Sequence, residues 1–162
     1  MATDIYTARF QGKVSTQNDP LTIRESASTS APVVGRLERG STNHRFAAWY
    51  PNGSSSSTAA WLLAYPNGQS GAAAGLVSAQ YITWLPSYSH DGGFVDYITV
   101  ASGEYVNLRK TPSKSASVIG KLHNNDAILV LRGFNTPNSG WTHVATAQGT
   151  GWVMTSYIAG KG

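Results

Sequence analysis

Residues 105–122 read YVNLRKTPSKSASVIGKL, and residues 21–37, earlier in the chain, read LTIRESASTSAPVVGRL. From Leu21 onward the two stretches align without a gap at an offset of 85 residues. The alignment is anchored by pairs of identical residues: Arg24 and Arg109, Gly35 and Gly120, and Leu37 and Leu122. Self-similarity at a long fixed spacing is the signature of a duplicated structural unit.

A second pair of matching segments extends the repeat. GLVSAQYI at residues 75–82 corresponds to GWVMTSYI at residues 151–158, at an offset of 76 residues. The first copy therefore has nine more residues between its two anchor segments, because the offset falls from 85 to 76. Each copy is near the lower size limit for an independent core, and the chain has no Cys to form disulfides or thiolate metal sites. We expect the two copies to pack on each other.

The local pattern predicts β-structure throughout. YITVASGEYVNLRK (97–110) alternates around a glycine turn, AILVLRGF (127–134) is rich in strand-forming residues, and WTHVATAQGTGWVM (141–154) reads as two strands joined by a turn. No segment has convincing helical spacing. Short strands separated by turns at intervals of about ten residues are typical of a small barrel or sandwich.

The charge distribution argues against several classes of partner. Charged residues make up 12% of the chain, against about 25% in an average soluble domain. The formal net charge of +4 comes from Lys and Arg residues scattered singly, whereas nucleic acids and anionic membranes are bound by clustered basic residues. No apolar run approaches the ~20 residues that a membrane-spanning helix needs. We therefore expect no nucleic-acid partner and no membrane span.

The second copy carries an ordered set of short motifs. In chain order these are Val106-Asn107-Leu108-Arg109, a Pro/Ser-containing loop at 111–117, Val118-Ile119-Gly120-Lys121-Leu122, Gly140-Trp141, Gly151-Trp152-Val153 and Tyr157-Ile158. Their order and spacing resemble the bacterial SH3 domain family (SH3b). The first copy resembles it less closely, since Thr22 stands where Asn107 does and Leu76 stands where Trp152 does.

The resemblance implies an all-β fold of two small SH3-like β-barrels in tandem, packed on each other. The repeat and the composition together place domain 1 at residues 1–83, with a Ser/Gly-rich insertion at about 48–74. A linker is expected at residues 84–96, and domain 2 at residues 97–162. In both domains we expect the arginine, Arg24 or Arg109, to clamp carbonyl groups of the following loop with its fork of donors. The alternative is that the arginine binds a ligand. One or both of Trp141 and Trp152 are expected in the core, with an indole edge that can still be exposed at a groove; of the two, Trp152 is the one expected to be fully buried.

Aromatic residues that the fold does not require are the candidates for ligand recognition. Aromatic rings with Asn and Ser neighbours form adaptable surfaces for sugars or peptides, because flat faces stack while amides form hydrogen bonds. Tyr105 is expected to face away from Val106 on an alternating strand. The candidate ligand-binding residues are Trp49, Tyr50, Tyr65, Tyr105, Phe134, Asn135 and Trp141. The alternative is that aromatics of the insertion and linker pack one copy onto the other.

The sequence offers little for catalysis. The four His residues, at positions 44, 90, 123 and 143, stand alone, with no spacing suited to a metal site. A Gly-x-Ser-x-Gly nucleophile elbow is missing, and the absence of Cys excludes a Cys/His hydrolase mechanism. We therefore expect no enzyme activity, no metal and no cofactor.

The resemblance implies attachment to the bacterial cell wall, with peptidoglycan peptide or glycan as the ligand. Domains of this kind commonly target a secreted wall hydrolase or a phage lysin. The low charge and lack of Cys favour such a segment of a larger secreted or cell-envelope protein, joined to a catalytic domain, over an intracellular chain. The alternative is a scaffold that positions a catalytic domain or docks onto a protein partner, for example by strand addition at an exposed sheet edge.

Overall fold

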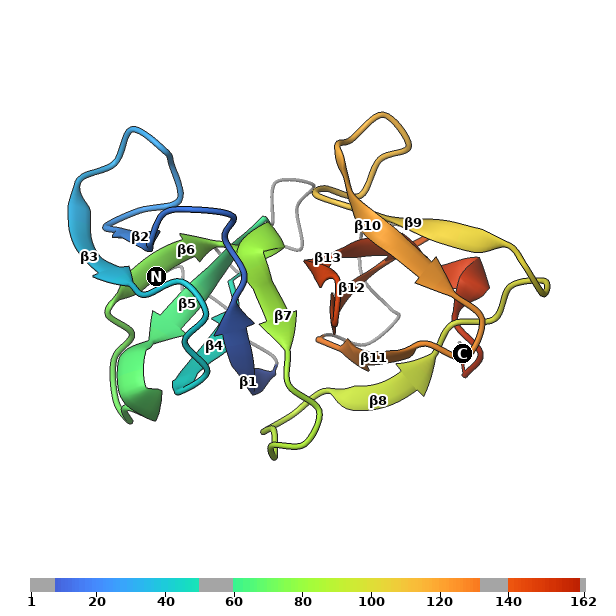
Figure 1. Ribbon diagram of the computed structural model, residues 1–162, viewed down its shortest axis with the longest axis horizontal. Helices are drawn as coiled ribbons and strands as arrows, with labels where there is room; N and C mark the ends of the chain where they lie inside the picture. Colours follow the sequence, from blue (N-terminus) through green and yellow to red (C-terminus); the bar gives the residue numbers. More distant parts are fainter. Residues whose placement is uncertain (1–7, 50–59, 132–139, 161–162) are drawn as a thin grey trace, which may run out of the picture.

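The computed structural model describes residues 8–49, 60–131 and 140–160, and in these ranges it is all-β (Figure 1). The first sheet contains β1 (Arg9–Val14), β2 (Leu21–Arg24), β3 (Val33–Leu37), β4 (His44–Ala48), β5 (Trp61–Tyr65), β6 (Gly75–Ser78) and β7 (Ile82–Trp84). The second contains β8 (Phe94–Tyr97), β9 (Tyr105–Arg109), β10 (Val118–His123), β11 (Ala127–Val130), β12 (Trp141–Thr146) and β13 (Gly149–Met154). Three short 3-10 helices complete the described ranges: η2 (Pro66–Gly68), η3 (Ala79–Tyr81) and η4 (Thr155–Tyr157).

The two sheets have the same strand order. The first runs β3-β2-β6-β5-β4-β1-β7 and the second β10-β9-β13-β12-β11-β8, with antiparallel pairing in both. Apart from β7, which adds to the outer side of β1, each strand of the first sheet has a counterpart at the same place in the second. The expectation of an all-β fold is confirmed. No helix in the described ranges is long and apolar enough to cross a lipid bilayer.

The loops that follow β2 and β9 repeat the same hydrogen bonds. Arg24 Nη1 donates to the carbonyl oxygen of Ala31 over 3.0 Å, and Arg109 Nη1 donates to that of Ala116 over 3.0 Å. The hydroxyl pairs Ser28–Ser30 and Ser113–Ser115 are also equivalent, at 2.8 and 2.9 Å. The predicted role of the two arginines as loop clamps is confirmed, and the clamp fixes each guanidinium at the end of its strand, β2 or β9.

A glycine in the neighbouring strand lets that strand approach the backbone of each arginine closely. A Cβ atom at Gly75 of β6 would lie 2.6 Å from the carbonyl oxygen of Arg24, and one at Gly151 of β13 would collide with that of Arg109 in the same way. Larger residues there would push the strands apart. The two glycines thus let β6 and β13 approach the backbone of the two clamped arginines closely.

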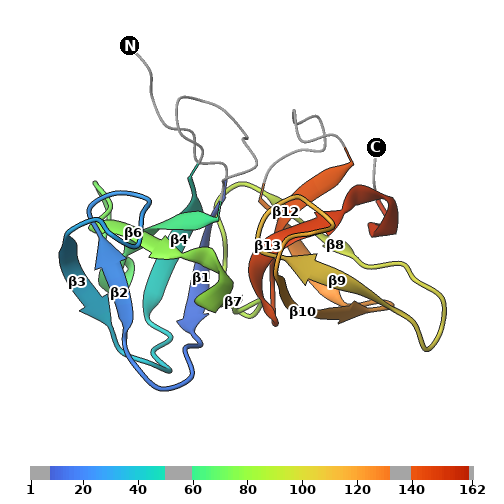
Figure 2. The same cartoon turned by 90° about the horizontal axis from the view of Figure 1, so that it is seen from above.

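Buried apolar residues form two clusters, one of which includes both sheets. The cluster confined to the second sheet includes Leu108, Ile128 and Val153. The other contains residues of the first sheet, such as Phe10 and Phe46, together with residues of the second. The members from the second sheet are Leu129, Ala145 and Trp152, and Leu131, directly after β11, also belongs to the cluster. Figures 1 and 2 show β7 at the junction, next to β12 and β13.

The segment that connects β7 to β8, residues 85–93, forms hydrogen bonds with the start of β1. Arg9 and Asp91 exchange two backbone hydrogen bonds of 2.8 Å, and Arg45 forms a 3.3 Å ion pair with the Asp91 carboxylate. Trp84, at the start of the predicted linker, is buried in the cluster that includes both sheets. Tyr88, further along, is exposed. The two aromatic residues of the predicted linker therefore differ. Trp84 packs in the cluster that includes both sheets, as the alternative interpretation predicted, whereas Tyr88 does not.

Part of the stretch predicted as an insertion is a strand of the sheet. β5 pairs with β4 on one side and with β6 on the other, for example through Phe46 and Ala64 and through Leu62 and Val77. Its side chains alternate in burial, because one face of the strand covers the core. β5 is the counterpart of β12, so Trp61, which begins β5, occupies the place of Trp141, which begins β12.

Candidate ligand-binding grooves

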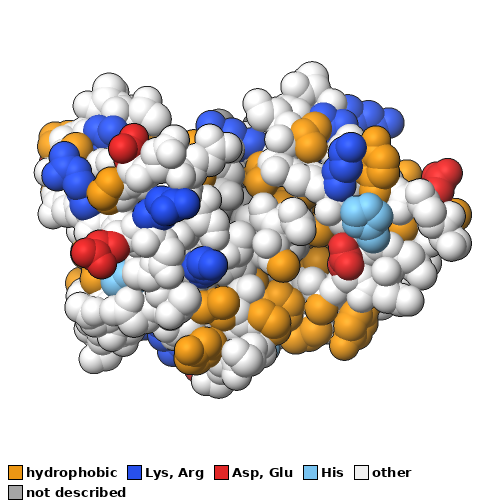
Figure 3. Space-filling view, viewed as in Figure 1, with side chains coloured by type: hydrophobic (Ala, Val, Ile, Leu, Met, Phe, Trp, Pro, Cys, Tyr) orange, Lys and Arg blue, Asp and Glu red, His pale blue; other side chains and the backbone are white. Residues whose placement is uncertain are grey.

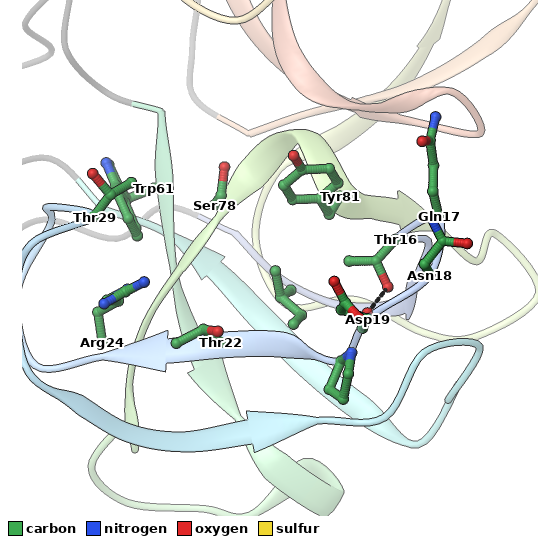
Figure 4. Close-up of a pocket in the computed structure, with 12 residues that line it drawn as sticks. Thr16, Gln17, Asn18, Asp19, Thr22, Arg24, Thr29, Trp61, Ser78 and Tyr81 are labelled. Atoms are coloured by element: carbon green, nitrogen blue, oxygen red, sulfur yellow. Dashed lines mark hydrogen bonds between the residues drawn. The ribbon is translucent and has the colours of Figure 1, made fainter.

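A groove of about 490 Å³ opens beside β2 in the first sheet. It lies between the loop that precedes β2, the first residue of β5 and the end of β6 with η3 (Figure 4). Its lining residues are Thr16, Gln17, Asn18, Asp19, Pro20, Leu21, Thr22, Arg24, Thr29, Trp61, Ser78 and Tyr81. Figure 4 shows Arg24, Thr29 and Trp61 at one end and Tyr81 toward the other. We call it the first groove.

A smaller hollow of about 280 Å³ lies beside β9 in the second sheet. Its lining residues are Tyr105, Val106, Asn107, Arg109, Lys114, Trp141, Met154 and Tyr157. They come from β9, the loop after it, the first residue of β12, the end of β13 and η4. We call it the second groove.

Strand pairing shows that the two grooves occupy the same place in the two sheets. Trp61 pairs with Ser78, and Trp141 pairs with Met154. Arg24 pairs with Leu76 of β6, and Arg109 with Trp152 of β13, which are equivalent positions in the repeat. Each groove therefore has an arginine, a tryptophan and a tyrosine in corresponding positions. These triplets are Arg24, Trp61 and Tyr81, and Arg109, Trp141 and Tyr157.

The second groove combines flat aromatic surface with hydrogen-bonding groups. Trp141 is partly buried against the cluster that includes both sheets, whereas Tyr105 is exposed and points away from the buried Val106, as predicted. The Lys121 ammonium lies 4.5 Å from the centre of the Tyr105 ring. Asn107 adds an amide. Such rings can stack on a sugar or peptide while the amide and cations form directed contacts.

The first groove is lined by more side chains with hydroxyl, amide or carboxylate groups. Ser78 takes the place of Met154, and Pro20 takes the place of Tyr105. The loop that enters β2 adds hydroxyl, amide and carboxylate groups, and within it Thr16 Oγ1 donates to the carbonyl oxygen of Asp19 over 2.5 Å (Figure 4). The same framework therefore presents a different chemical surface in each half of the chain.

The structure places the predicted site residues in different surroundings. Tyr105 and Trp141 lie together in the second groove. Tyr65 is buried at the end of β5, with the Arg9 guanidinium 3.7 Å from its ring centre, and lines neither groove. Trp49, directly after β4, is partly buried and also lines neither. Tyr50, Phe134 and Asn135 lie outside the described residues.

Sequence reasoning missed three aromatic residues of the grooves. Tyr81 and Tyr157 stand at the same position of the matching segments GLVSAQYI and GWVMTSYI, so the repeat itself was a signal for them. Trp61 corresponds to Trp141 only once β5 is aligned with β12. The signal was the strand pattern WLLAY, which the Ser/Gly-rich surroundings obscured.

Two histidines are buried away from the grooves. His143 stacks on Trp152 with ring centres 4.5 Å apart, and burial lowers its pKa to about 3. Burial also lowers the pKa of His44, whose Nδ1 accepts a 3.0 Å hydrogen bond from the Asn67 backbone N–H. Both are neutral near pH 7. Within the described ranges, no group of three or more His, Cys, Asp or Glu residues is arranged to hold a metal ion.

The second groove lies in a segment with a recognisable sequence signature. Residues 104–159 match the bacterial SH3 domain family. The match extends from just before Tyr105 to just beyond Tyr157, so every residue that lines the second groove belongs to this bacterial SH3 segment. The resemblance predicted for the second copy is thereby confirmed, while residues 1–103 lie outside the match.

Solved structures offer a distant comparison. The chain is similar to the structures of NlpC2 and NlpC1 from Trichomonas vaginalis, each at 12% sequence identity, with TM-scores of 0.38 and 0.39. The alignments cover 97% and 99% of this chain but 49% and 48% of those structures, so the chain spans about half their length. No curated protein matches the chain.

Proposed function

We propose that this chain is a non-catalytic binding module that attaches to the bacterial cell wall, with peptidoglycan peptide or glycan as its ligand. The observation that carries the proposal is the repeated groove, whose second copy lies in the bacterial SH3 segment. Each groove offers a tryptophan and a tyrosine for stacking beside an arginine clamped at its edge. These groups suit the recognition of a sugar or peptide and leave the ligand chemically unchanged.

We also propose that the first half of the chain is a second, diverged bacterial SH3 domain. Three features support this: the strand order, the arginine clamp with its serine pair, and the groove all occur in both halves. Two binding sites in one molecule would increase retention on a polymer, because the second engagement is intramolecular. A tandem module of this kind fits a secreted wall hydrolase or phage lysin, in which it would hold a linked catalytic domain at its substrate.

Sedimentation with intact sacculi tests the proposal. The purified chain is mixed with sacculi from several wall types, before and after removal of the other wall polymers, at low and high salt. We expect retention on at least one wall type and weaker retention of the Trp141→Ala variant. Tyr88→Ala is the matched control, because Tyr88 is exposed and lines neither groove. No retention on any wall, or equal loss in the control, would contradict the proposal.

A second candidate function is supported by the outer strand of the second sheet. β8 is an edge strand, and its residues Phe94, Val95 and Tyr97 have large exposed side chains. Figure 3 shows apolar side chains gathered along the lower part of the molecule on the face it displays. Exposed apolar groups on an edge strand favour a protein contact. If Val95→Lys abolishes binding to a purified catalytic partner while sacculus retention is absent, the chain is a scaffold.

A further inference from the structure

The two grooves differ in charge although they share a framework. The charged residues that line the second groove are Arg109 and Lys114, and no Asp or Glu is among its described lining residues. The first groove has Arg24 at the position of Arg109 but Thr29 at the position of Lys114, and Asp19 adds a carboxylate. The formal charge of the lining is therefore balanced in the first groove and positive in the second.

The surroundings of the second groove add to this difference. The Lys121 ammonium lies over the ring of Tyr105, which itself lines the groove. In the first half the corresponding residues are Arg36 and Pro20, so no aromatic ring holds the cation at the rim. Glu104, directly before Tyr105, is exposed but does not line the groove. The second groove is therefore lined by two cations and no carboxylate, and a third cation, Lys121, lies over the ring of one lining residue.

Arg109 retains donors for a ligand. Its Nη1 donates to the carbonyl oxygen of Ala116, which fixes the guanidinium plane. A guanidinium has five N–H donors, so this single bond leaves others that can reach a carboxylate or phosphate oxygen. Lys114 is exposed on the loop held by the clamp and can supply a second, flexible positive charge. A fixed donor and a flexible one together suit an anionic group.

We propose that the second groove binds a negatively charged group, carboxylate or phosphate, beside the flat face of a sugar or peptide, whereas the first groove binds an uncharged part of a ligand. The anion preference follows from the charges alone, and its assignment to the cell wall rests on the proposed function above. In a wall, carboxylates come from peptide stems and phosphates from phosphodiester polymers. Either source supplies the same interaction with Arg109 and Lys114.

Nuclear magnetic resonance of the full chain tests the preference without sacculi. Three probes are titrated at millimolar concentration: N-acetyl-alanyl-alanine, its uncharged C-terminal amide, and glycerol phosphate. The indole N–H signals of Trp141 and Trp61 report on the second and first grooves and are assigned with Trp→Phe variants. Two variants exchange the residues at this corresponding position: Lys114→Thr introduces the threonine of the first groove into the second, and Thr29→Lys introduces the lysine of the second groove into the first. The carboxylate and phosphate arms distinguish the two sources of charge.

The expected result is that an anionic probe shifts the Trp141 signal with a dissociation constant about twofold to fivefold lower than the amide does, since exposed charge pairs contribute modestly. Lys114→Thr reduces this difference, because Arg109 remains as the only lining cation, and Thr29→Lys creates a difference at Trp61. Equal binding of the amide, an unchanged preference in Lys114→Thr, or no shift of Trp141 by either anion would overturn the inference. Sacculus retention with an anion-indifferent second groove refutes this inference alone, whereas anion binding without retention refutes the wall assignment alone.

Discussion

Thr150 donates a hydrogen bond of 2.9 Å from its side-chain hydroxyl to the backbone carbonyl oxygen of Ile82. Both residues are buried, Thr150 on β13 of the second sheet and Ile82 on β7 of the first. The bond joins the two sheets where the cluster of buried apolar residues includes both. Because β13 also carries Met154 of the second groove and β7 follows Tyr81 of the first, the junction connects the supports of the two grooves.

Removal of this hydrogen bond should destabilise the whole chain. We expect Thr150→Val to lower the free energy of unfolding by about 1–3 kcal/mol, because a buried carbonyl loses a partner while the side-chain shape is kept. Urea denaturation followed by tryptophan fluorescence measures the effect. Thr83→Val, on the same strand as Ile82 and at the exposed Ser15 contact, is the control and should change stability little. Equal losses of unfolding free energy in the two variants would contradict a specific stabilising role of the buried Thr150–Ile82 hydrogen bond.

Gly149 makes a second contact across the junction. Its φ is +135°, and a Cβ atom there would lie 2.8 Å from the backbone carbonyl oxygen of Gln80 in η3. We expect Gly149→Ala to be destabilising, because the new methyl group is both strained and crowded against backbone. Gly103→Ala is a matched control, since its φ is also positive (+81°) but no atom lies within 4 Å of the added Cβ. A larger loss of thermal stability in Gly103→Ala would contradict the described junction.

The tryptophans of the second sheet should separate stability from binding. Trp152 is completely buried, so Trp152→Ala should cost about 3–5 kcal/mol of unfolding free energy. Trp141 is only partly buried at the groove, so Trp141→Ala should cost clearly less stability while it weakens sacculus binding. Thermal denaturation and sedimentation of the same preparations measure both effects. A Trp141→Ala protein as unstable as Trp152→Ala would assign Trp141 to the core instead.

Acid should weaken the fold through His143. Burial lowers its pKa to about 3, whereas the unfolded chain titrates near 6.5. Between these values the unfolded state binds a proton that the folded state does not. Stability is therefore retained above pH 6.5 and falls as the pH is lowered toward 3, with a slope that approaches about 1.4 kcal/mol per pH unit for this residue.

The test compares the pH dependence of unfolding free energy in the wild type and in His143→Phe, which keeps a ring against Trp152. The variant should show a shallower slope in this range, whatever its absolute stability. His44, whose pKa is also lowered by burial, remains in both proteins and contributes equally. Identical slopes would show that His143 takes up its proton in the folded state as readily as in the unfolded one.

The repeat in the sequence predicted those features that depend on local pattern. The equivalence of Arg24 and Arg109 predicted two similar loops, and the structure gives them the same clamp. Alternation around Tyr105 and Val106 predicted which side chain is exposed. Trp152 lies in the core, as a Gly-Trp-Val strand of a small barrel suggests. Each of these features depends only on residues close together in the sequence, within one strand or one turn.

The grooves could not be predicted as units because they join distant segments. Trp61 lies 14 residues before Gly75, whereas Trp141 lies 10 residues before Gly151, so the repeat does not align the two tryptophans without a gap. Tyr65 was a candidate for ligand contact because of its loop-like surroundings, but strand pairing of β5 buries it beneath Arg9. The register of β5 in the sheet determines the positions of both Trp61 and Tyr65. A single sequence does not specify this register.

The most direct test of the central claim is the affinity of four proteins for the wall type that retains the wild type: the wild type, Trp61→Ala, Trp141→Ala and the double variant. If both grooves engage the polymer, each single variant should lose about a hundredfold in apparent affinity as intramolecular binding is lost, and the double variant should not be retained. A double variant that stays folded and binds as well as the wild type would show that the repeated groove is not the wall-binding site.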